Sequence, residues 1–231
     1  MKLSIIIPVY NEEQTIGDVI DRVYAADVGA LEKEVIVAND GSEDGTAPAI
    51  DASRWRSDGR LRIFENAINL GKGAAIRLGL RYAQGDIVLI QDADLELDPG
   101  EYPRLLAPIL SGAADVVYGS RFLGKNPGIS RSTRLANRFL TTVTNVLYGS
   151  QLTDMETGYK LFRREVLSGL RLRCVGFDFE PEVTARLLLA GRRIHEVAIE
   201  YRPRRPDEGK KIRWIDGVDG VYTLIKCRLV R

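Results

Sequence analysis

The chain has 231 residues, 45% of them hydrophobic, with 33 Lys and Arg against 32 Asp and Glu. This composition is typical of a globular protein, and the near-zero net charge argues against a nucleic-acid-binding protein, which would carry a dominant basic field. The charges are nevertheless segregated, because positions 86–101 hold six acidic and no basic residues whereas 202–213 is mostly Arg and Lys. Segregation of this kind predicts a cation site in one place and an anion or membrane surface in the other, although two solvated faces would give the same pattern.

The sequence also bears on the compartment. Cys174 and Cys227 have neither a metal-type nor a CxxC spacing, which favours a reducing compartment. The apolar run at 5–9 is too short for a signal peptide and is followed by acidic residues. No stretch approaches the roughly 18 apolar residues that a membrane-spanning helix needs. We therefore expect a cytoplasmic protein, or one at the cytoplasmic face of the membrane.

The first half of the chain alternates strand-like and helix-like segments, which is typical of a parallel α/β sheet. Asn11 is expected to cap a helix at 13–26, and Pro99 to lie in the first turn of a helix at 99–110. A further helix is expected at 71–83. The apolar and β-branched runs that predict strands lie at 3–9, 34–38, 61–66, 86–92 and 115–121.

The second half has a different pattern. A basic loop rich in Gly, Pro and Ser at 122–132 precedes a helix at 133–148. A strand at 160–167, a helix at 179–191 and a strand at 193–202 are expected to follow. Because no repeat or linker interrupts the chain, the sequence predicts a single α/β domain over residues 1–231.

The strongest chemical signal is the acidic run at 92–96, placed where an apolar strand ends. In open parallel sheets, ligands bind beyond the carboxyl ends of the strands. Asp92 and Asp94 are two residues apart, and burying such a pair without a partner would cost several kcal/mol. Mg²⁺ and Mn²⁺ are typically held by one or two carboxylates together with phosphate oxygens. The run therefore predicts a metal–phosphate site; the competing interpretation is an acidic turn that caps the next helix.

Two further strands also end in polar residues. After the strand at 34–38, Asp40 could accept a hydrogen bond from a nucleobase and Gly41 would let a ligand approach the backbone, although Asp-Gly-Ser is also common turn chemistry. After the strand at 3–9, Tyr10 offers a stacking face for a base, although a lone aromatic residue more often belongs to the core. Three strand ends at one edge of the sheet together favour a ligand site.

Basic residues supply the anion-binding candidates. Lys72 follows Gly71 at an expected helix start, where backbone N–H groups favour anions, although a solvated lysine is the competing interpretation. Arginines and lysines through the 122–132 loop and the next helix would give a lipid phosphate charge-assisted donors. A second basic group near the C-terminus precedes Trp214 and an amphipathic tail, as an interfacial membrane segment or a solvated helix would. The two groups are Arg121, Lys125, Arg131, Arg134 and Arg138, and then Arg204, Arg205, Lys210, Lys211 and Arg213.

Taken together, the motifs PVYNE (8–12), NDGS (39–42), NLGKGAAIRLGL (69–80), DADLE (92–96) and GSRF (119–122) resemble family 2 glycosyltransferases. TDMETGYKLFRREVL (153–167) and GFDFEPEVTARL (176–187) resemble the polyprenyl (dolichyl) phosphate mannose or glucose synthases of that family, so the resemblance covers nearly the whole chain. It implies an inverting, metal-dependent transferase with one GT-A (Rossmann-like) domain, whose mostly parallel central sheet is flanked by helices. Residues 1–121 would form the nucleotide-sugar half, and 122–231 the acceptor half with a basic, membrane-associated tail.

For the donor, the resemblance implies that Asp94 holds Mg²⁺ or Mn²⁺ on the diphosphate, with Glu96 as a further ligand. Asp92 would lie beside the ribose and the metal. Asn39 stands where most relatives have Asp, which keeps the shape, removes the charge and leaves the base preference open. The residues expected to bind the nucleotide sugar are Pro8, Tyr10, Asn11, Glu12, Asp40, Lys72 and Asp92.

For the acceptor, the resemblance implies that Arg121 meets a phosphate. Arg131 or Arg134 would be the second basic group, since the register near 133 is open by a residue or two. Catalysis would rest on Asp92, Asp94 and Arg121.

The expected reaction moves a hexose from a GDP-mannose or UDP-glucose type donor to a polyprenyl phosphate, with inversion in a single displacement. A phosphate is already ionised near neutral pH, so no strong base is needed. One alternative is a family 2 transferase acting on a sugar hydroxyl in cell-surface glycan synthesis, for which Asp154 or Glu156 could serve as base. Less favoured are a sugar nucleotidyltransferase, whose Gly-rich N-terminal signature is missing, and a non-catalytic binding module, in which the paired acids would be expected to be lost.

Overall fold

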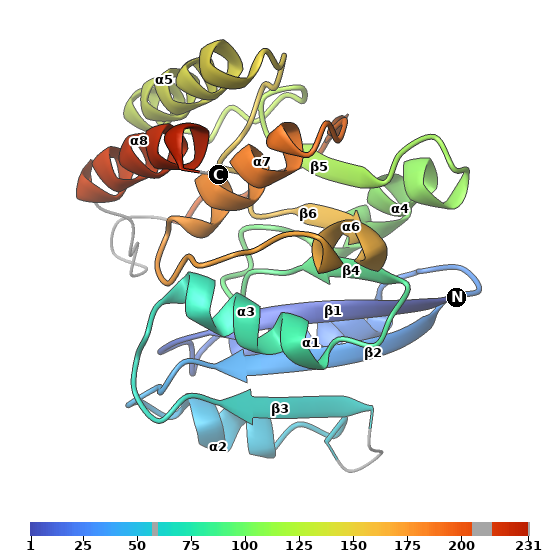
Figure 1. The fold of residues 1–231 in the computed structure, drawn as a ribbon. Helices are drawn as coiled ribbons and strands as arrows, with labels where there is room; N and C mark the ends of the chain where they lie inside the picture. The colour runs from blue at the N-terminus through green and yellow to red at the C-terminus, as the bar shows by residue number, and fades with distance from the viewer. Residues whose placement is uncertain (57–59, 205–213, 231) are drawn as a thin grey trace.

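The computed structural model describes residues 1–56, 60–204 and 214–230, which surround a seven-stranded sheet in the order β3-β2-β1-β4-β6-β5-β7 (Figure 1). The ladder pairs are parallel except where β6 runs antiparallel to β4 and to β5. This confirms the predicted α/β class with a mostly parallel central sheet. The strands are β1 (Lys2–Val9), β2 (Glu32–Asn39), β3 (Leu61–Glu65), β4 (Ile87–Ile90), β5 (Val116–Ser120), β6 (Lys160–Arg163) and β7 (His195–Ala198).

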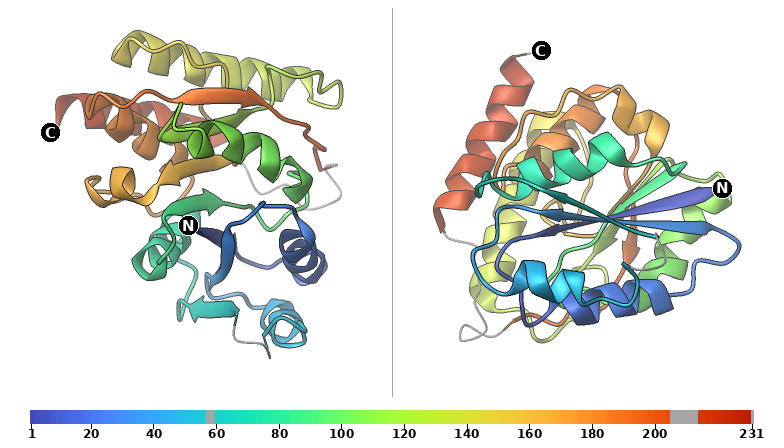
Figure 2. Two further views of the ribbon diagram at one scale, coloured as in Figure 1. Left: turned by 90° about the vertical axis from the view of Figure 1, so that its right-hand side faces the viewer. Right: turned by 90° about the horizontal axis from the view of Figure 1, so that it is seen from below.

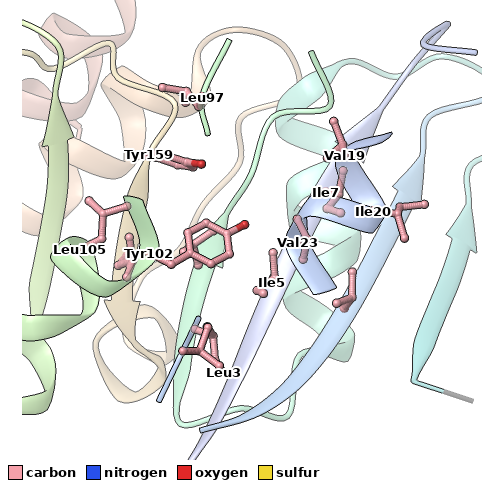
Figure 3. Packing of buried hydrophobic residues seen from close by; sticks show 14 of the residues in the cluster. Leu3, Ile5, Ile7, Val19, Ile20, Val23, Leu97, Tyr102, Leu105 and Tyr159 are labelled. Carbon is pink, nitrogen blue, oxygen red and sulfur yellow. The ribbon is translucent and has the colours of Figure 1, made fainter. Parts of the chain in front are cut away.

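Helices cover both faces of the sheet, which is why the central strands are apolar on both sides. Alternate side chains of β1 enter two cores: Ile5 and Ile7 pack with one set of helices, and Ile6 packs with the other (Figure 3). The first set is α1 (Ile16–Ala25), α2 (Thr46–Asp51) and α4 (Tyr102–Leu110). The second is α3 (Lys72–Tyr82), α6 (Arg164–Ser168) and α7 (Phe179–Leu189).

A further layer lies outside α7. There α5 (Arg131–Tyr148) and α8 (Trp214–Leu229) lie side by side (Figures 1 and 2). Leu140, Met155 and Leu224 form the small core between them. Among the described residues, no helix is both long enough and apolar enough to cross a bilayer. Cys174 and Cys227 are free and buried.

Two sequence-based expectations were wrong, and one further helix begins differently from an α-helix. Asn11 does not cap α1, since Thr15 occupies the cap position and the Asn11 side chain accepts from the amide of Glu43 at 2.9 Å. The strand expected at 160–167 ends at Arg163, after which Arg164 begins α6 with its amide bonded to a carbonyl before β4. A single 3₁₀ turn, Pro99–Glu101, precedes α4.

The close approach of α3 to β1 gives a stability prediction. A Cβ at Gly79 would overlap the branched Cγ2 of buried Ile6, whereas a Cβ at Gly17 in α1 would meet nothing within 4 Å. Both Gly→Ala changes gain helix propensity, so Gly17→Ala should stabilise by about 0.5–1 kcal/mol. Gly79→Ala should instead destabilise by about 1–3 kcal/mol because the core is overpacked. Urea denaturation of the two variants measures the difference; equal shifts would contradict the packing.

Candidate active site

The predicted polar strand ends lie at one edge of the sheet, because β2, β1 and β4 are neighbouring parallel strands. Their turns are hydrogen-bonded to one another. The amide of Asn11 donates to Ser42 Oγ at 3.0 Å, and the Glu12 amide donates to Thr46 Oγ1 at 2.8 Å. Thr15 Oγ1 donates to the carbonyl of Ala93 at 2.8 Å. The three turns therefore form one connected surface.

Gln91, which the sequence analysis did not single out, fixes the acidic turn. Its fully buried side chain donates to the carbonyls of Asp92 (3.0 Å) and Leu97 (3.3 Å). Its Oε1 accepts from the hydroxyls of Tyr102 (2.7 Å) and Tyr159 (2.8 Å), whose rings lie in the core between the sheet and α4 (Figure 3). The sequence did contain a signal for this role, because Gln91 is a polar residue at the end of an apolar strand.

Backbone strain is concentrated in the same turns. In the described chain, the non-glycine residues with positive φ are Asn11 (50°) and Leu95 (60°). Leu95 separates Asp94 from Glu96, and a leucine adopts this conformation only when its surroundings enforce it. Strain of this kind is common where a turn must present side chains to a ligand.

Asp92 is held by a lysine from another element. Lys72 Nζ, at the start of α3, lies 2.8 Å from Asp92 Oδ1 and 2.8 Å from Glu180 Oε1 on α7. Burial lowers the pKa of Lys72, but the two carboxylates overcome that effect and raise it above its usual range. Lys72 therefore orients Asp92. On the other side, a Cβ at Gly158 would overlap Asp92 Oδ2, so the carboxylate is packed from both directions.

Asp94 carries negative charge that its neighbours do not balance. Burial, followed by the charges of Asp92 and Glu96, raises its pKa to about 7 despite the opposing effect of Arg204. A divalent cation would relieve this repulsion, so the turn fits Mg²⁺ or Mn²⁺. Among the described residues no group of three or more His, Cys, Asp or Glu side chains is arranged to hold a metal. Phosphate oxygens would therefore have to supply further ligands, as is usual for Mg²⁺.

Glu96 and Glu12 have partners that the sequence could not reveal. Glu96 Oε2 accepts from the Tyr201 hydroxyl and Oε1 from the Arg204 amide, both at 2.7 Å. Arg204 forms a two-pronged ion pair with Glu12, through Nη2 to Oε2 (2.6 Å) and Nη1 to Oε1 (3.1 Å). Glu96 and Glu12 are therefore both bonded to segment 199–204.

Asp40 anchors the turn before α3. Its oxygens accept from Asn66 Nδ2 (2.8 Å), from the Leu70 amide (3.1 Å) and from the Gly71 amide (2.6 Å). Asp40 is 2% exposed, and these bonds position the start of α3. Gly41 likewise makes room for the backbone at Ile68, not for a ligand.

The remaining donor-side residues differ in accessibility. Tyr10 is half-buried at the edge, and Pro8 is buried within the β1–β2 ladder. Asn39 is 3% exposed and caps its own turn, with Oδ1 accepting from the Ser42 amide at 3.1 Å. Its Nδ2 donates to Glu65 at 3.1 Å, a bond that an aspartate could not make. The unusual Asn is therefore explained by contacts within the protein.

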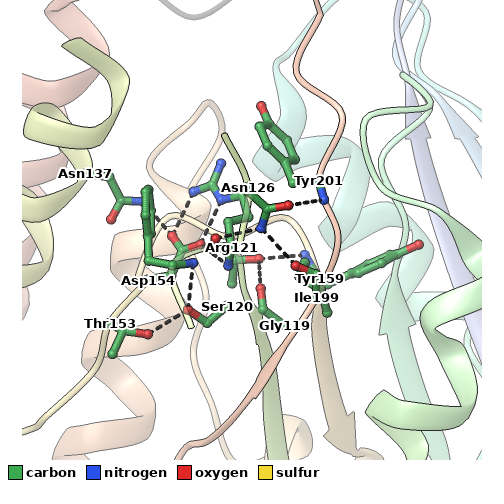
Figure 4. A network of polar contacts seen from close by, with 12 residues as sticks. Gly119, Ser120, Arg121, Asn126, Asn137, Thr153, Asp154, Tyr159, Ile199 and Tyr201 are labelled. Atoms are coloured by element: carbon green, nitrogen blue, oxygen red, sulfur yellow. Dashed lines mark hydrogen bonds and ion pairs between the residues drawn. The ribbon is translucent and has the colours of Figure 1, made fainter. Parts of the chain in front are cut away.

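On the acceptor side, Arg121 is fixed by Asp154 (Figure 4). Its Nε and Nη2 donate to the two carboxylate oxygens at 2.7 and 2.8 Å, and its amide donates to Oδ2 at 2.9 Å. Asn137 of α5 adds a fourth bond to Asp154. Because its oxygens are all engaged, Asp154 cannot serve as a base.

The structure also distinguishes the two candidate arginines of α5. The guanidinium carbons of Arg134 and Arg121 lie 5.3 and 5.7 Å from the centre of the same Phe122 ring. Arg131 is exposed at the first turn of α5 and shares no such contact among the described residues. Arg134 is therefore the arginine placed beside Arg121. The predicted basic group at 205–213 and the side chain of Trp214 lie outside the residues that the structure describes.

A nearly parallel sheet with paired acids beyond β4 defines an α/β enzyme of the GT-A type. The family model for glycosyl transferase family 2 matches residues 4–171. The chain therefore belongs to glycosyltransferase family 2 and is a glycosyltransferase, as the motifs predicted.

Individual relatives refine this placement. An undecaprenyl-phosphate mannosyltransferase of Micrococcus luteus is 30% identical over 218 residues, covering 91% of this chain and 87% of that protein. A polyprenol monophosphomannose synthase of Mycolicibacterium smegmatis is 30% identical, covering 87% and 77%. Glucosyl-3-phosphoglycerate synthase of Mycobacterium tuberculosis, solved with Mn²⁺, UDP-glucose and phosphoglyceric acid, has 25% identity and a TM-score of 0.73, covering 100% of this chain and 80% of that one. Another structure of that enzyme contains Mg²⁺ and UDP.

The shared lysine gives a prediction for the site. Lys72→Met leaves Asp92 and Glu180 without their common partner, which should cost about 3 kcal/mol of stability. It should also lower kcat/KM at least about tenfold, because a misplaced catalytic group loses the productive geometry. Arg81→Met, which removes an exposed cation from the other end of α3, is the matched control. Thermal unfolding and donor turnover measure both effects; a Lys72→Met protein as stable and active as the control would contradict the assignment.

Proposed function

We propose that this glycosyltransferase moves a hexose from a nucleotide sugar to a polyprenyl phosphate, with inversion and with Mg²⁺ or Mn²⁺. The observation that carries the proposal is the link between the acidic turn and Arg121. Tyr201 donates to Glu96, two residues after Asp94, and its ring centre lies 5.2 Å from the Arg121 guanidinium carbon. The acidic turn, which is suited to a metal–diphosphate, and Arg121, which is suited to an acceptor phosphate, thus both contact the Tyr201 side chain. The two bacterial relatives, named for sugar transfer to polyprenyl phosphates, support the same acceptor.

In this proposal each half of the chain binds one substrate. Residues 1–121 hold the donor, with Tyr10 at the accessible edge and Asp92 beside the ribose. Asp94 would hold the metal, which when bound stabilises charge on the departing diphosphate. Residues 122–231 face the acceptor, whose phosphate would meet Arg121 and Arg134. The phosphate is already ionised and needs no base, which agrees with the finding that the Asp154 carboxylate is fully engaged.

Metal dependence is tested at Asp94. Asp94→Asn removes the charge that would bind the cation, and kcat/KM should fall roughly a hundredfold or more, since a catalytic metal contributes several kcal/mol to the barrier. Asp98→Asn is the matched control, because Asn still caps the 3₁₀ turn that Asp98 caps now. Release of nucleoside diphosphate is measured with each divalent cation and in excess EDTA. Full turnover in EDTA would exclude the metal.

We also propose that the outer face of α5 binds the cytoplasmic surface of the membrane that contains the acceptor. Leu135 (71% exposed), Phe139 (59%) and Val146 (78%) follow helical spacing along this face. The helix contains no acidic residue, and Arg131 and Arg138 flank the apolar stripe. An apolar stripe flanked by arginines is what an interfacial helix requires on an anionic membrane.

The membrane proposal predicts that Leu135→Asp with Phe139→Asp weakens binding to anionic liposomes at least tenfold, because charge replaces inserted apolar surface. Leu110→Asp, at a leucine on α4 that is 48% exposed, should leave binding unchanged. Wild-type binding should also weaken as salt rises, since anionic lipids contribute part of the attraction. Co-sedimentation measures all three. Unaltered binding of the double variant would place the membrane contact elsewhere.

A further inference from the structure

Glu156 occupies the turn that connects the two sides of the site. Two residues before it, Asp154 holds Arg121; two residues after it, Gly158 packs on Asp92. The turn is rigid, since the Lys160 ammonium donates to the carbonyls on both sides of Glu156, those of Met155 and Thr157. Glu156 is thus presented by a fixed loop between the donor acid and the acceptor arginine.

The Glu156 carboxyl is not satisfied within the protein. Its Oε1 is buried and has no hydrogen-bond partner among the described residues. An unpaired buried polar atom is unfavourable, and more so when the group is charged. Such an atom is expected where a ligand supplies the missing partner.

The surrounding charges favour the neutral form of this carboxyl. Glu180 from α7 and Asp154 from the preceding loop face it, with Lys160 of β6 and Arg121 after β5 as the nearby cations. Both cations are already used, Lys160 by the turn carbonyls and Arg121 by Asp154. Burial, followed by the charge of Glu180, raises the pKa of Glu156 to about 7 despite the two cations.

We propose that Glu156 binds the acceptor as a neutral acid, donating a hydrogen bond from its carboxyl to an oxygen of the acceptor phosphate. This role rests on the proposed function and adds a specificity residue to it. A different phosphate oxygen attacks the sugar, so Glu156 keeps its proton and no bond to it forms or breaks. An ionised Glu156 would repel the phosphate, whereas the neutral acid gains the partner that the protein does not provide. The site would then take its acceptor with three donors: Arg121, Arg134 and Glu156.

The test compares Glu156→Ala with Glu156→Gln, whose amide N–H is a permanent donor of similar shape. The acceptor KM and kcat are measured with polyprenyl phosphate between pH 6 and 9, and nucleotide affinity is measured by calorimetry. Glu156→Ala should raise the acceptor KM at least tenfold at pH 6.5 with nucleotide affinity unchanged, and Glu156→Gln should restore most of that loss. Glu165→Gln, at an exposed residue of α6, is the control for the substitution itself.

The pH profile carries the decisive readout. Because the protonated form binds, the wild-type acceptor KM should rise above the pKa of Glu156, approaching about tenfold per pH unit for one proton. Glu156→Gln should lose this rise. Two results would overturn the role of Glu156 as a hydrogen-bond donor. One is a parallel rise of the acceptor KM in the wild type and in Glu156→Gln; the other is a large loss of kcat in Glu156→Gln, as expected if Glu156 were a base. Neither result would contradict transfer to polyprenyl phosphate. Wild-type transfer to a sugar hydroxyl alone would overturn both proposals.

Discussion

The ion pairs of Lys72 hold together the elements on which the site depends. One ammonium group is shared between Asp92 after β4 and Glu180 on α7, so three segments meet at a single partly buried charge. Without it, the buried carboxylate of Glu180 and the partly buried carboxylate of Asp92 would both lose this partner, which is unfavourable. The lysine is itself placed by Asp40, which binds the amides of Leu70 and Gly71 just before α3. The end of β2 therefore controls the geometry at the end of β4 through the start of a helix.

The distribution of partners separates structural charges from functional ones. Asp154 is neutralised by Arg121 and Glu12 by Arg204. Two acids remain poorly compensated, Asp94 beside the donor turn and Glu156 beside Arg121, and burial raises the pKa of each to about 7. Groups with shifted pKa values cluster at functional sites, because a protein leaves uncompensated charge there and neutralises it elsewhere. The donor and acceptor sides thus each retain one group for a ligand to complete.

Much of the fold could be predicted, because hydrophobic periodicity determines buried strands and places their polar ends at one sheet edge. Individual roles could not, because they depend on partners far away in sequence. Glu96 is engaged by Arg204, 108 residues later, and Asp40 by the amide of Gly71. The strand β6 was expected, but its antiparallel direction and its end at Arg163 were not predicted. An apolar run at 160–167 indicates neither the direction of a strand nor where a helix replaces it.

Segment 199–204 adds a last constraint, because it contacts both sides of the site. The Tyr201 amide donates to Asn126 Oδ1, and Asn126 in turn donates to the carbonyl of Arg121. Within three residues the same segment binds Glu96 and Glu12 on the donor side. A shift of this segment must therefore break donor-side and acceptor-side bonds together. The segment therefore fixes the donor-side and acceptor-side groups relative to one another.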